Sequence, residues 1–228
     1  MMKEDLPPLE LWIQDIQSYL YKIIAVPMER AGFKFDKYNY VFTRKHGKHA
    51  QEFGFLFVNQ FPINYRINFM LQVHNKKVKE VKSAFFQSLK RDDFNLSSLV
   101  TSLRDFGEHS KDSRLKDYII FGNKELFAAA ESISKILQYE AIPLCNQLSN
   151  LNDLDNLYTI RNGWSVTNYS IDNITSELII ARLNNKRNFQ QLYELIADRI
   201  ERKDSERRID TDAGVIVERC YQFIMKKY

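Results

Sequence analysis

Three histidines lie close to predicted turns and are the side chains best suited to hold a metal ion. His46 and His49 have the spacing H-x-x-H, and His74 stands at the end of a long alternating segment. Imidazole nitrogens bind divalent transition metals. However, H-x-x-H brings two rings together only on a helix, and Gly47 between them favours a turn. We therefore interpret His46 and His49 as exposed turn histidines and predict no metal site.

Three pairs of acidic residues could ligate a divalent cation through their carboxylate oxygens. Each pair stands just before, or within, the first turn of a predicted helix. There a carboxylate accepts hydrogen bonds from free N–H groups and interacts favourably with the helix dipole. We interpret the pairs as helix caps: Asp92 with Asp93, Asp153 with Asp155, and Asp210 with Asp212.

The sequence lacks the motifs that bind phosphates or supply a catalytic nucleophile. Its seven glycines never form G-x-G-x-x-G or G-x-x-x-x-G-K-[ST], and G-x-S-x-G is absent as well. We predict no catalytic residue and no cofactor. An enzyme would have to use residues that are dispersed along the chain.

Basic residues gather in one part of the chain. Residues 33–91 hold twelve Lys and Arg against three acidic residues, a formal charge of +9, whereas the whole chain carries +4. Such a segment concentrates acidic partners by long-range attraction. The alternative is that solvated lysines protect a sheet edge from aggregation. The candidate partner-binding residues are Arg44, Lys45, Lys48, Arg66, His74, Lys76 and Lys79.

A row of polar side chains follows the longest alternating segment. Successive side chains of a strand point to opposite faces, so this row is expected to project from one face of a sheet. Such a row binds a ligand or a partner when another element covers it, and it is equally typical of any half-exposed strand. The row consists of Asn64, Arg66, Asn68, Gln72 and His74.

The elements that must position these residues follow from hydrophobic periodicity. Apolar residues at three- and four-residue spacing predict helices, and alternation predicts strands. Pro27 is expected to kink or break the first helix near Ala25, and Pro143 to stop or kink a later one. The expected helices cover about residues 8–29, 78–89, 126–141, 154–157, 174–183, 189–200 and 215–224, and the expected strands 38–44, 53–57, 63–73, 99–103 and 118–121.

Together these elements predict an α+β fold. An N-terminal helix packs on an antiparallel β-meander of three to five strands, and a mostly helical C-terminal portion follows. The long strand is expected to be central, with Ile67, Phe69 and Leu71 buried. A soft boundary near residue 150 separates an α+β domain, 1–150, from a helical portion, 151–228, which belongs to the same domain if it caps the sheet.

The order of the first elements resembles that of a known group of proteins. A helix is followed by Gly32-Phe33-Lys34, by the aromatic strand Tyr38–Arg44 and by a long alternating strand. This order is similar to uncharacterised bacterial domains of unknown function that begin with a helix, a Gly-Phe turn and an aromatic β-hairpin. The resemblance covers about residues 9–75. It implies the same α+β arrangement and implies no functional residue.

Composition excludes several classes of protein. Of 228 residues, 44% are apolar and 27% are charged, as in ordinary globular proteins. We see no apolar run long enough for a membrane span and no apolar core of a secretory signal. Two cysteines, Cys145 and Cys220, are too few for a disulfide framework and too far apart for a zinc motif. We expect a cytoplasmic protein with two buried, reduced thiols.

Our leading hypothesis is that the protein binds another macromolecule without catalysis, as bacterial immunity proteins and antitoxins do. The alternative is nucleic-acid binding through the basic segment, with aromatic side chains stacking on bases while lysines contact phosphates. An enzyme with a dispersed active site is the third hypothesis. The expected partner is an acidic protein or a nucleic acid, and the sequence predicts no particular oligomeric state. The aromatic residues available for stacking are Tyr38, Tyr40, Phe53 and Phe55.

Overall fold

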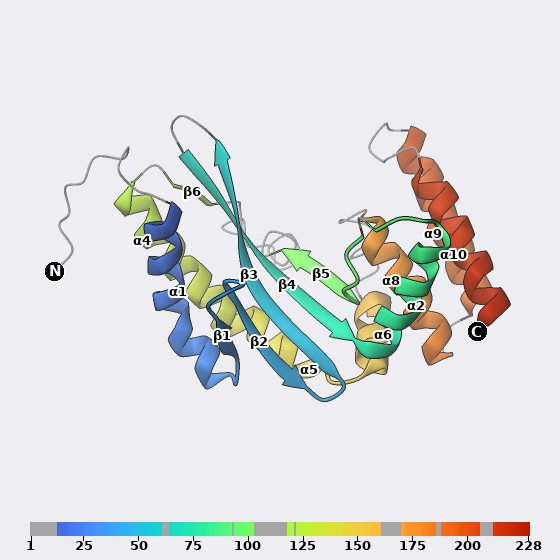
Figure 1. Ribbon diagram of the computed structural model, residues 1–228, viewed down its shortest axis with the longest axis horizontal. Coiled ribbons are helices and arrows are strands. Elements are labelled where there is room, and N and C mark those ends of the chain that lie inside the picture. The colour runs from blue at the N-terminus through green and yellow to red at the C-terminus, as the bar shows by residue number, and fades with distance from the viewer. Residues whose placement is uncertain are drawn as a thin grey trace. The chain divides into compact units, whose positions relative to one another are not determined.

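The structure is a computed structural model, and it describes residues 13–60, 64–92, 94–102, 118–120, 122–160, 170–185, 188–205 and 212–228. Helix α1 (Ile13–Arg30) precedes an antiparallel sheet, and a mostly helical region follows (Figure 1). The predicted α+β fold class is therefore confirmed.

The sheet is a meander, as the change of period from 3.6 to 2 predicts. Its strands follow the order β1-β2-β3-β4-β5, so neighbours in the chain are neighbours in the sheet, and β6 pairs with β4 in antiparallel fashion. Both short strands expected after the long one are confirmed. The strands are β1 (Lys34–Asp36), β2 (Val41–His46), β3 (His49–Gln60), β4 (Asn64–Asn75), β5 (Leu99–Ser102) and β6 (Tyr118–Ile120).

Strand β4 has the alternation of buried and polar side chains that its sequence predicts. Ile67 and Leu71 have exposed fractions of 0% and 1%. Gln72 and His74, which have the opposite parity and so point to the other face, are only half-buried. The predicted burial is confirmed for Ile67 and Leu71, whereas the side chain of Phe69 lies outside the described residues.

The strand predicted over 38–44 is wrong at its beginning. Residues 37–40 form a turn, which β1 precedes and β2 follows. The Asp36 carboxylate accepts hydrogen bonds from the N–H groups of Tyr38 and Asn39, and Tyr40 adopts a left-handed φ of 53°. A side chain that bonds the backbone two residues ahead is typical of an Asx turn. Tyr38 is consequently 84% exposed instead of packed in the core.

Helix α1 packs on the sheet through an aromatic cluster. The Tyr21 ring lies 4.8 Å from the ring of Phe35, 5.8 Å from that of Phe42 and 5.1 Å from that of Phe55, measured between centroids. The helix continues through Pro27 to Arg30, so a break near residue 25 does not occur. Helix α1 also packs against α4 (Asn123–Ile136), which lies beside it in Figure 1.

Helix α4 also continues past the point where a proline was expected to stop it. It passes through a π-helical turn, η2 (Leu137–Ala141), into α5 (Ile142–Gln147), which contains Pro143. The N–H of Ile142 donates to the carbonyl of Leu137, five residues earlier, so the turn holds one extra residue. Pro143 therefore does not stop this helix, and the alternative, a kink at Pro143, stays a prediction.

The chain divides into two compact units. The first takes its described residues from Met1–Lys45, Gln51–Leu71 and Thr101–Gln147, and the second takes its described residues from His46–Ala50, Gln72–Val100 and Leu148–Tyr228. Strands β2, β3, β4 and β5 contribute residues to both units. The predicted domain boundary near residue 150 stays a prediction.

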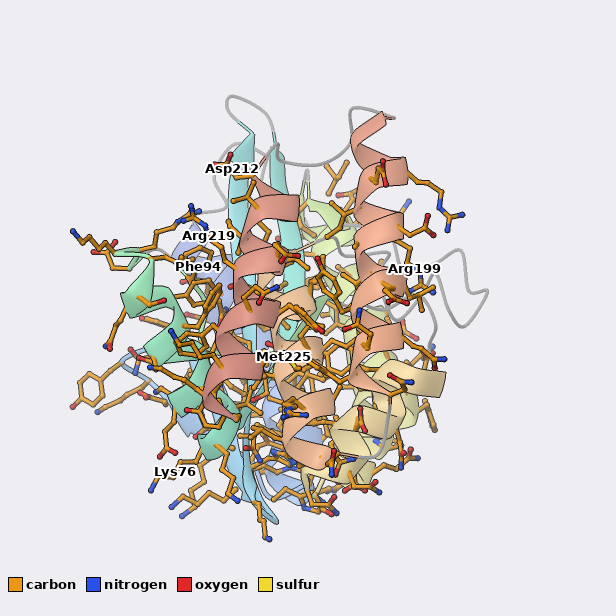
Figure 2. All side chains as sticks on the ribbon, turned by 90° about the vertical axis from the view of Figure 1, so that its right-hand side faces the viewer. Lys76, Phe94, Arg199, Asp212, Arg219 and Met225 are labelled. Atoms are coloured by element: carbon orange, nitrogen blue, oxygen red, sulfur yellow. The ribbon has the colours of Figure 1, made fainter. Side chains whose placement is uncertain are left out.

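Helix α8 (Ile171–Asn184) is the central helix of the second unit. It contacts four other helices, and α9 and α10 of this group lie side by side in Figure 2. All nine residues from Asn173 to Ala181 are buried. Polar side chains on this part of α8 must therefore find their hydrogen-bond partners inside the protein. The four helices are α2 (Lys76–Ser88), α6 (Leu151–Ile160), α9 (Phe189–Ser205) and α10 (Ala213–Lys227).

Candidate functional site

The second unit contains a fully buried charged side chain, Lys82, whose exposed fraction is 0%. Lys82 lies on α2, four residues after Val78 and three before Phe85, both of which are buried. Residues three and four apart share a helix face. Lys82 was not among the predicted site residues, although this spacing places it within the apolar stripe and could have revealed its burial.

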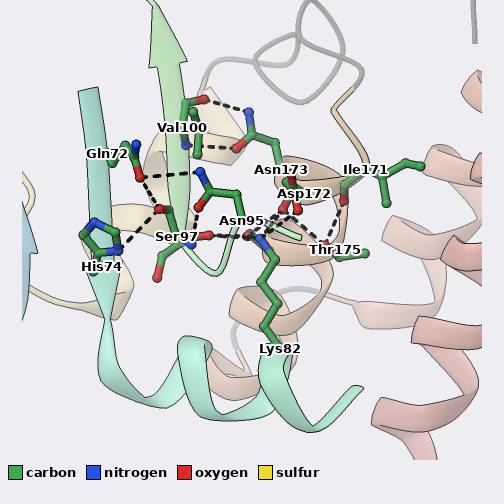
Figure 3. Close-up of polar contacts among 12 residues, drawn as sticks. Gln72, His74, Lys82, Asn95, Ser97, Val100, Ile171, Asp172, Asn173 and Thr175 are labelled. Carbon is green, nitrogen blue, oxygen red and sulfur yellow. Dashed lines mark hydrogen bonds and ion pairs between the residues drawn. The ribbon is translucent and has the colours of Figure 1, made fainter. Parts of the chain in front are cut away.

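The Lys82 ammonium group is held by three oxygen acceptors (Figure 3). Its Nζ donates to the carbonyl of Ser97 at 3.0 Å, to the carbonyl of Asp172 at 2.8 Å and to the Ser176 hydroxyl at 3.0 Å. The Asp172 carboxylate lies 3.7 Å from the same nitrogen. A lysine ammonium has three N–H donors, so all three are engaged.

Burial lowers the pKa of Lys82 to about 8, although the nearby Asp172 carboxylate acts in the opposite direction. A lysine with a lowered pKa can serve as a base or a nucleophile where a substrate reaches it. Here the side chain has no exposed surface, and its donors are occupied. The arrangement instead ties α2 to α8 and to the segment that precedes β5.

A second polar contact fixes β5 against α8. The Asn173 side chain accepts a hydrogen bond from the N–H of Val100 at 3.0 Å and donates one to the carbonyl of the same residue at 2.8 Å. A side-chain amide that pairs with both backbone groups of one residue imitates a neighbouring strand. Asn173 therefore gives the N–H and the carbonyl of Val100 in β5 hydrogen-bond partners where β5 faces the buried helix α8.

The end of the predicted polar row on β4 is covered. The Ser97 hydroxyl donates to the Gln72 side chain at 2.7 Å and lies 3.3 Å from Nδ1 of His74, while the Asn95 amide donates to Gln72 at 3.5 Å (Figure 3). His74, one of the predicted partner-binding residues, therefore packs against the segment before β5. The side chains of the row's first three members, at 64, 66 and 68, lie outside the described residues.

Three of the predicted partner-binding residues belong to the first unit. Arg44 is half-buried, and its guanidinium donates three hydrogen bonds inside this unit. Lys45 is exposed. The side chain of Arg66 lies outside the described residues, while its backbone pairs with that of Ile119 in β6. Of these three, Lys45 has the exposure that an intermolecular contact requires.

The remaining predicted lysines lie in the second unit, next to a contact between the β2–β3 hairpin and α2. The Asn75 side chain caps α2 by accepting from the N–H of Val78, and its Nδ2 lies 3.4 Å from Nδ1 of His49. The β2–β3 hairpin tip therefore meets the beginning of α2, and Figure 2 shows one lysine of this helix start, Lys76. We call the exposed lysines around this contact the lysine cluster: Lys48, Lys76, Lys77 and Lys79.

The first turn of α2 contains lysines and no acidic residue. The N-terminus of a helix carries a partial positive charge, so cations there cost about 0.3–1 kcal/mol each. Lys76 lies 3.9 Å from Glu80, but both side chains are more than half exposed. Exposed pairs of this kind contribute little to stability. The placement of these lysines is therefore not explained by the stability of the helix.

The prediction that His49 is exposed is wrong, because its exposed fraction is 2%. The hairpin tip packs closely on the chain that precedes α6: the N–H of Lys48 donates to the carbonyl of Ser149 at 2.8 Å. Gly47, with a φ of +57°, permits this approach because it has no side chain. Burial lowers the pKa of His49. Among the described residues, no group of three or more His, Cys, Asp or Glu is arranged to hold a metal ion.

The interpretation of the acidic pairs as helix caps is confirmed for Asp153. Its carboxylate accepts from the N–H groups of Ser149 and Asn150 at 2.8 and 2.9 Å. Burial raises the pKa of Asp153, but these hydrogen bonds outweigh it and the pKa is lowered. The interpretation is wrong for Asp155, which is buried and accepts from Asn184 on α8. Asp92 does not begin a described helix. Asp212 occupies the N-cap of α10, but its side chain makes no capping hydrogen bond. Asp93 and Asp210 lie outside the described residues.

Both thiols are free and buried, as their helical surroundings predict. Burial raises the pKa of Cys145 and that of Cys220 to about 12. A thiol is nucleophilic as the thiolate. Neither cysteine therefore has the properties of a catalytic nucleophile.

No family model, curated protein or solved structure matches this chain. The similarity to bacterial domains of unknown function stays a prediction. Within the described part of the chain, no helix is both long enough and apolar enough to cross a membrane.

Proposed function

We propose that this protein binds the acidic surface of another protein through the lysine cluster and does not catalyse a reaction. The observation that carries this proposal is the set of lysines in the first turn of α2, where the helix dipole opposes them and where the turn itself holds no acidic residue; the exposed pair of Lys76 with Glu80 offsets this only weakly. Positions that break a local rule without a structural gain are typical of functional sites. An acidic partner supplies the missing negative charge.

The geometry of the cluster supports a protein surface as the partner. Lys48 extends the charge from the helix to the hairpin tip, and the contact between Asn75 and His49 fixes both elements. Charges held on rigid elements give complementarity and fast association with a surface of opposite charge. Four exposed lysines surround this contact, whereas the acidic residues near it are Glu80, 3.9 Å from Lys76, and Asp153, whose carboxylate acts on His49.

The test is a titration of the protein with poly-L-glutamate at 50 and 200 mM salt. Replacing the four lysines of the cluster by Gln should weaken binding at least about tenfold at low salt, because each lost ion pair is only partly screened there. The matched control replaces four exposed basic residues elsewhere, which lowers the net charge equally and should change the affinity less than about twofold: Lys22, Lys124, Arg219 and Lys226. Equal losses in both variants would show that net charge alone drives binding and would refute the proposal.

A second candidate function is the binding of single-stranded nucleic acid by the turn between β1 and β2. Tyr38 is 84% exposed, its ring centroid lies 5.3 Å from Nζ of Lys37, and Tyr40 is 49% exposed. Stacking of a base on an aromatic ring contributes about 1–3 kcal/mol. Tyr38→Ala should then weaken the binding of a single-stranded oligonucleotide at least about fivefold while poly-L-glutamate binding stays unchanged. An oligonucleotide affinity that Tyr38→Ala leaves unaltered would exclude this candidate.

A further inference from the structure

The first unit contains a groove of about 510 Å³. One wall is the last part of α1, and the other follows the π-turn η2 into α5. A volume of this size lies within the range of small-molecule sites. The lining residues are Val26, Pro27, Arg30, Ala31, Gln138, Ile142 and Asn146.

Both walls of the groove are irregular helices. Pro27 lies inside α1, and Pro143 follows the π-turn that contains Gln138. Each proline removes a backbone donor from its helix and costs stability. π-Turns occur frequently at functional sites. Two such irregularities on opposite walls of one groove are hard to explain by packing alone.

Arg44 joins the two walls. Its Nη1 donates to the carbonyl of Ala31 at 2.6 Å, and its Nη2 donates to the Asn146 side chain at 2.7 Å. Its Nε donates to Gln51 at 2.8 Å, and Gln51 in turn donates to the carbonyl of Cys145 at 2.7 Å. This bonding fixes the width of the groove at one end and places a positive charge beside it.

The charged side chain among the residues that line the groove is basic. Arg30 is exposed and supplies a guanidinium with five N–H donors, and Gln138 supplies an amide. The described lining residues include no carboxylate. Val26 and Ile142 supply apolar surface on the two walls. A ligand that fits carries an anionic group together with an apolar part.

We propose that this groove binds a small organic anion, a carboxylate or phosphate ester attached to an apolar ring or short chain. The oxyanion pairs with Arg30, and the apolar part packs against Val26 and Ile142. Planar guanidinium groups recognise both oxyanions in bidentate geometry. The groove shares no residue with the lysine cluster, so this proposal is independent of the proposed function.

The test is a titration of protein labelled at the Ala, Val and Ile methyl groups, followed by NMR. The probes are phenyl phosphate, benzoate and benzyl alcohol, which share a ring and differ in charge. Phenyl phosphate or benzoate should shift the methyl signals of Val26, Ala31 and Ile142 in a saturable manner. Benzyl alcohol should bind at least about tenfold more weakly, because it carries no oxyanion to pair with the Arg30 guanidinium.

Two variants decide whether the anions bind in the groove. Arg30→Gln should weaken phenyl phosphate and benzoate binding about tenfold and leave the weak binding of benzyl alcohol unchanged. Arg219→Gln, at an exposed site on α10, is the matched control and should leave every affinity unchanged. Equal binding of the alcohol and the anions, shifts outside the groove, an absence of saturation, or insensitivity to Arg30→Gln would each overturn the proposal. The relative response to the two anions identifies the preferred oxyanion.

Discussion

Replacing Lys82 by Met should destabilise the protein by an amount that grows with pH. Met has nearly the same length and cannot donate, so the substitution removes three hydrogen bonds and the cation beside Asp172. Breaking a buried ion pair costs about 3–5 kcal/mol. The Asp172 side chain is 24% exposed and can be partly solvated, which reduces the expected loss to about 2 kcal/mol at pH 7.

The pH dependence follows from the lowered pKa. The pKa of the Lys82 amine is about 8 in the folded protein and has its ordinary value of 10.5 in the unfolded chain. Between these values the unfolded chain holds more protons than the folded protein, so this group makes the wild-type protein more stable as the pH rises. Well below pH 8 the Lys82 amine is protonated in both the folded and the unfolded state, and its contribution to the unfolding free energy does not change with pH. From pH 7 to 9.5 this group raises the unfolding free energy of the wild-type protein by about 2 kcal/mol.

Urea unfolding followed by circular dichroism at pH 7 and at pH 9.5 measures both effects. The difference in unfolding free energy between the wild type and Lys82→Met should rise from about 2 to about 4 kcal/mol. Lys77→Met, at an exposed site on the same helix, should show a small difference at both pH values. A Lys82→Met difference that is equal at the two pH values, or smaller at pH 9.5, would refute the reasoning.

Two further predictions concern the hairpin tip and the thiols. Gly47→Ala should cost about 2–4 kcal/mol in urea unfolding, because φ is positive and a Cβ would overlap the carbonyl of Ser149. Gly32→Ala, with a positive φ and open space, should cost only about 1 kcal/mol, and equal costs would contradict the close approach. Cys145 and Cys220 should react with a thiol reagent at pH 7.5 only after unfolding, because burial raises their pKa to about 12. Rapid labelling of the native protein would contradict this.

Much of the sheet could be predicted because strand periodicity is local. The alternation along β4 is enough to assign Ile67 and Leu71 to the buried face. The start of β2 could not be found in the same way, because Tyr38 and Tyr40 also alternate with polar residues. There the hydrogen bonds of Asp36 to the following N–H groups outweigh the pattern.

The buried polar cluster was beyond prediction for a different reason. The spacing around Lys82 indicates its burial, but its acceptors come from Ser97 and from Asp172 and Ser176 on α8, about 90 residues away in the chain. Nothing in the local sequence pairs these segments. The covering of His74 by Ser97 likewise depends on a loop whose course periodicity does not describe.

The central position of α8 has a consequence during protein synthesis. Lys82 and Ser176, which bond to each other, are separated by 94 residues. At about 5–20 residues per second a ribosome needs about 5–20 s to cover that distance. During this interval α2 has already been made, while the helix that covers it has not.

For those seconds α2 lacks its packing against α8, although its buried face includes the apolar residues Val78, Val81 and Phe85. Exposed apolar surface on a nascent chain favours aggregation and chaperone binding. A message truncated before α8 should therefore yield an insoluble product even though it encodes the whole meander. The second unit is complete only after α8, α9 and α10 have been made.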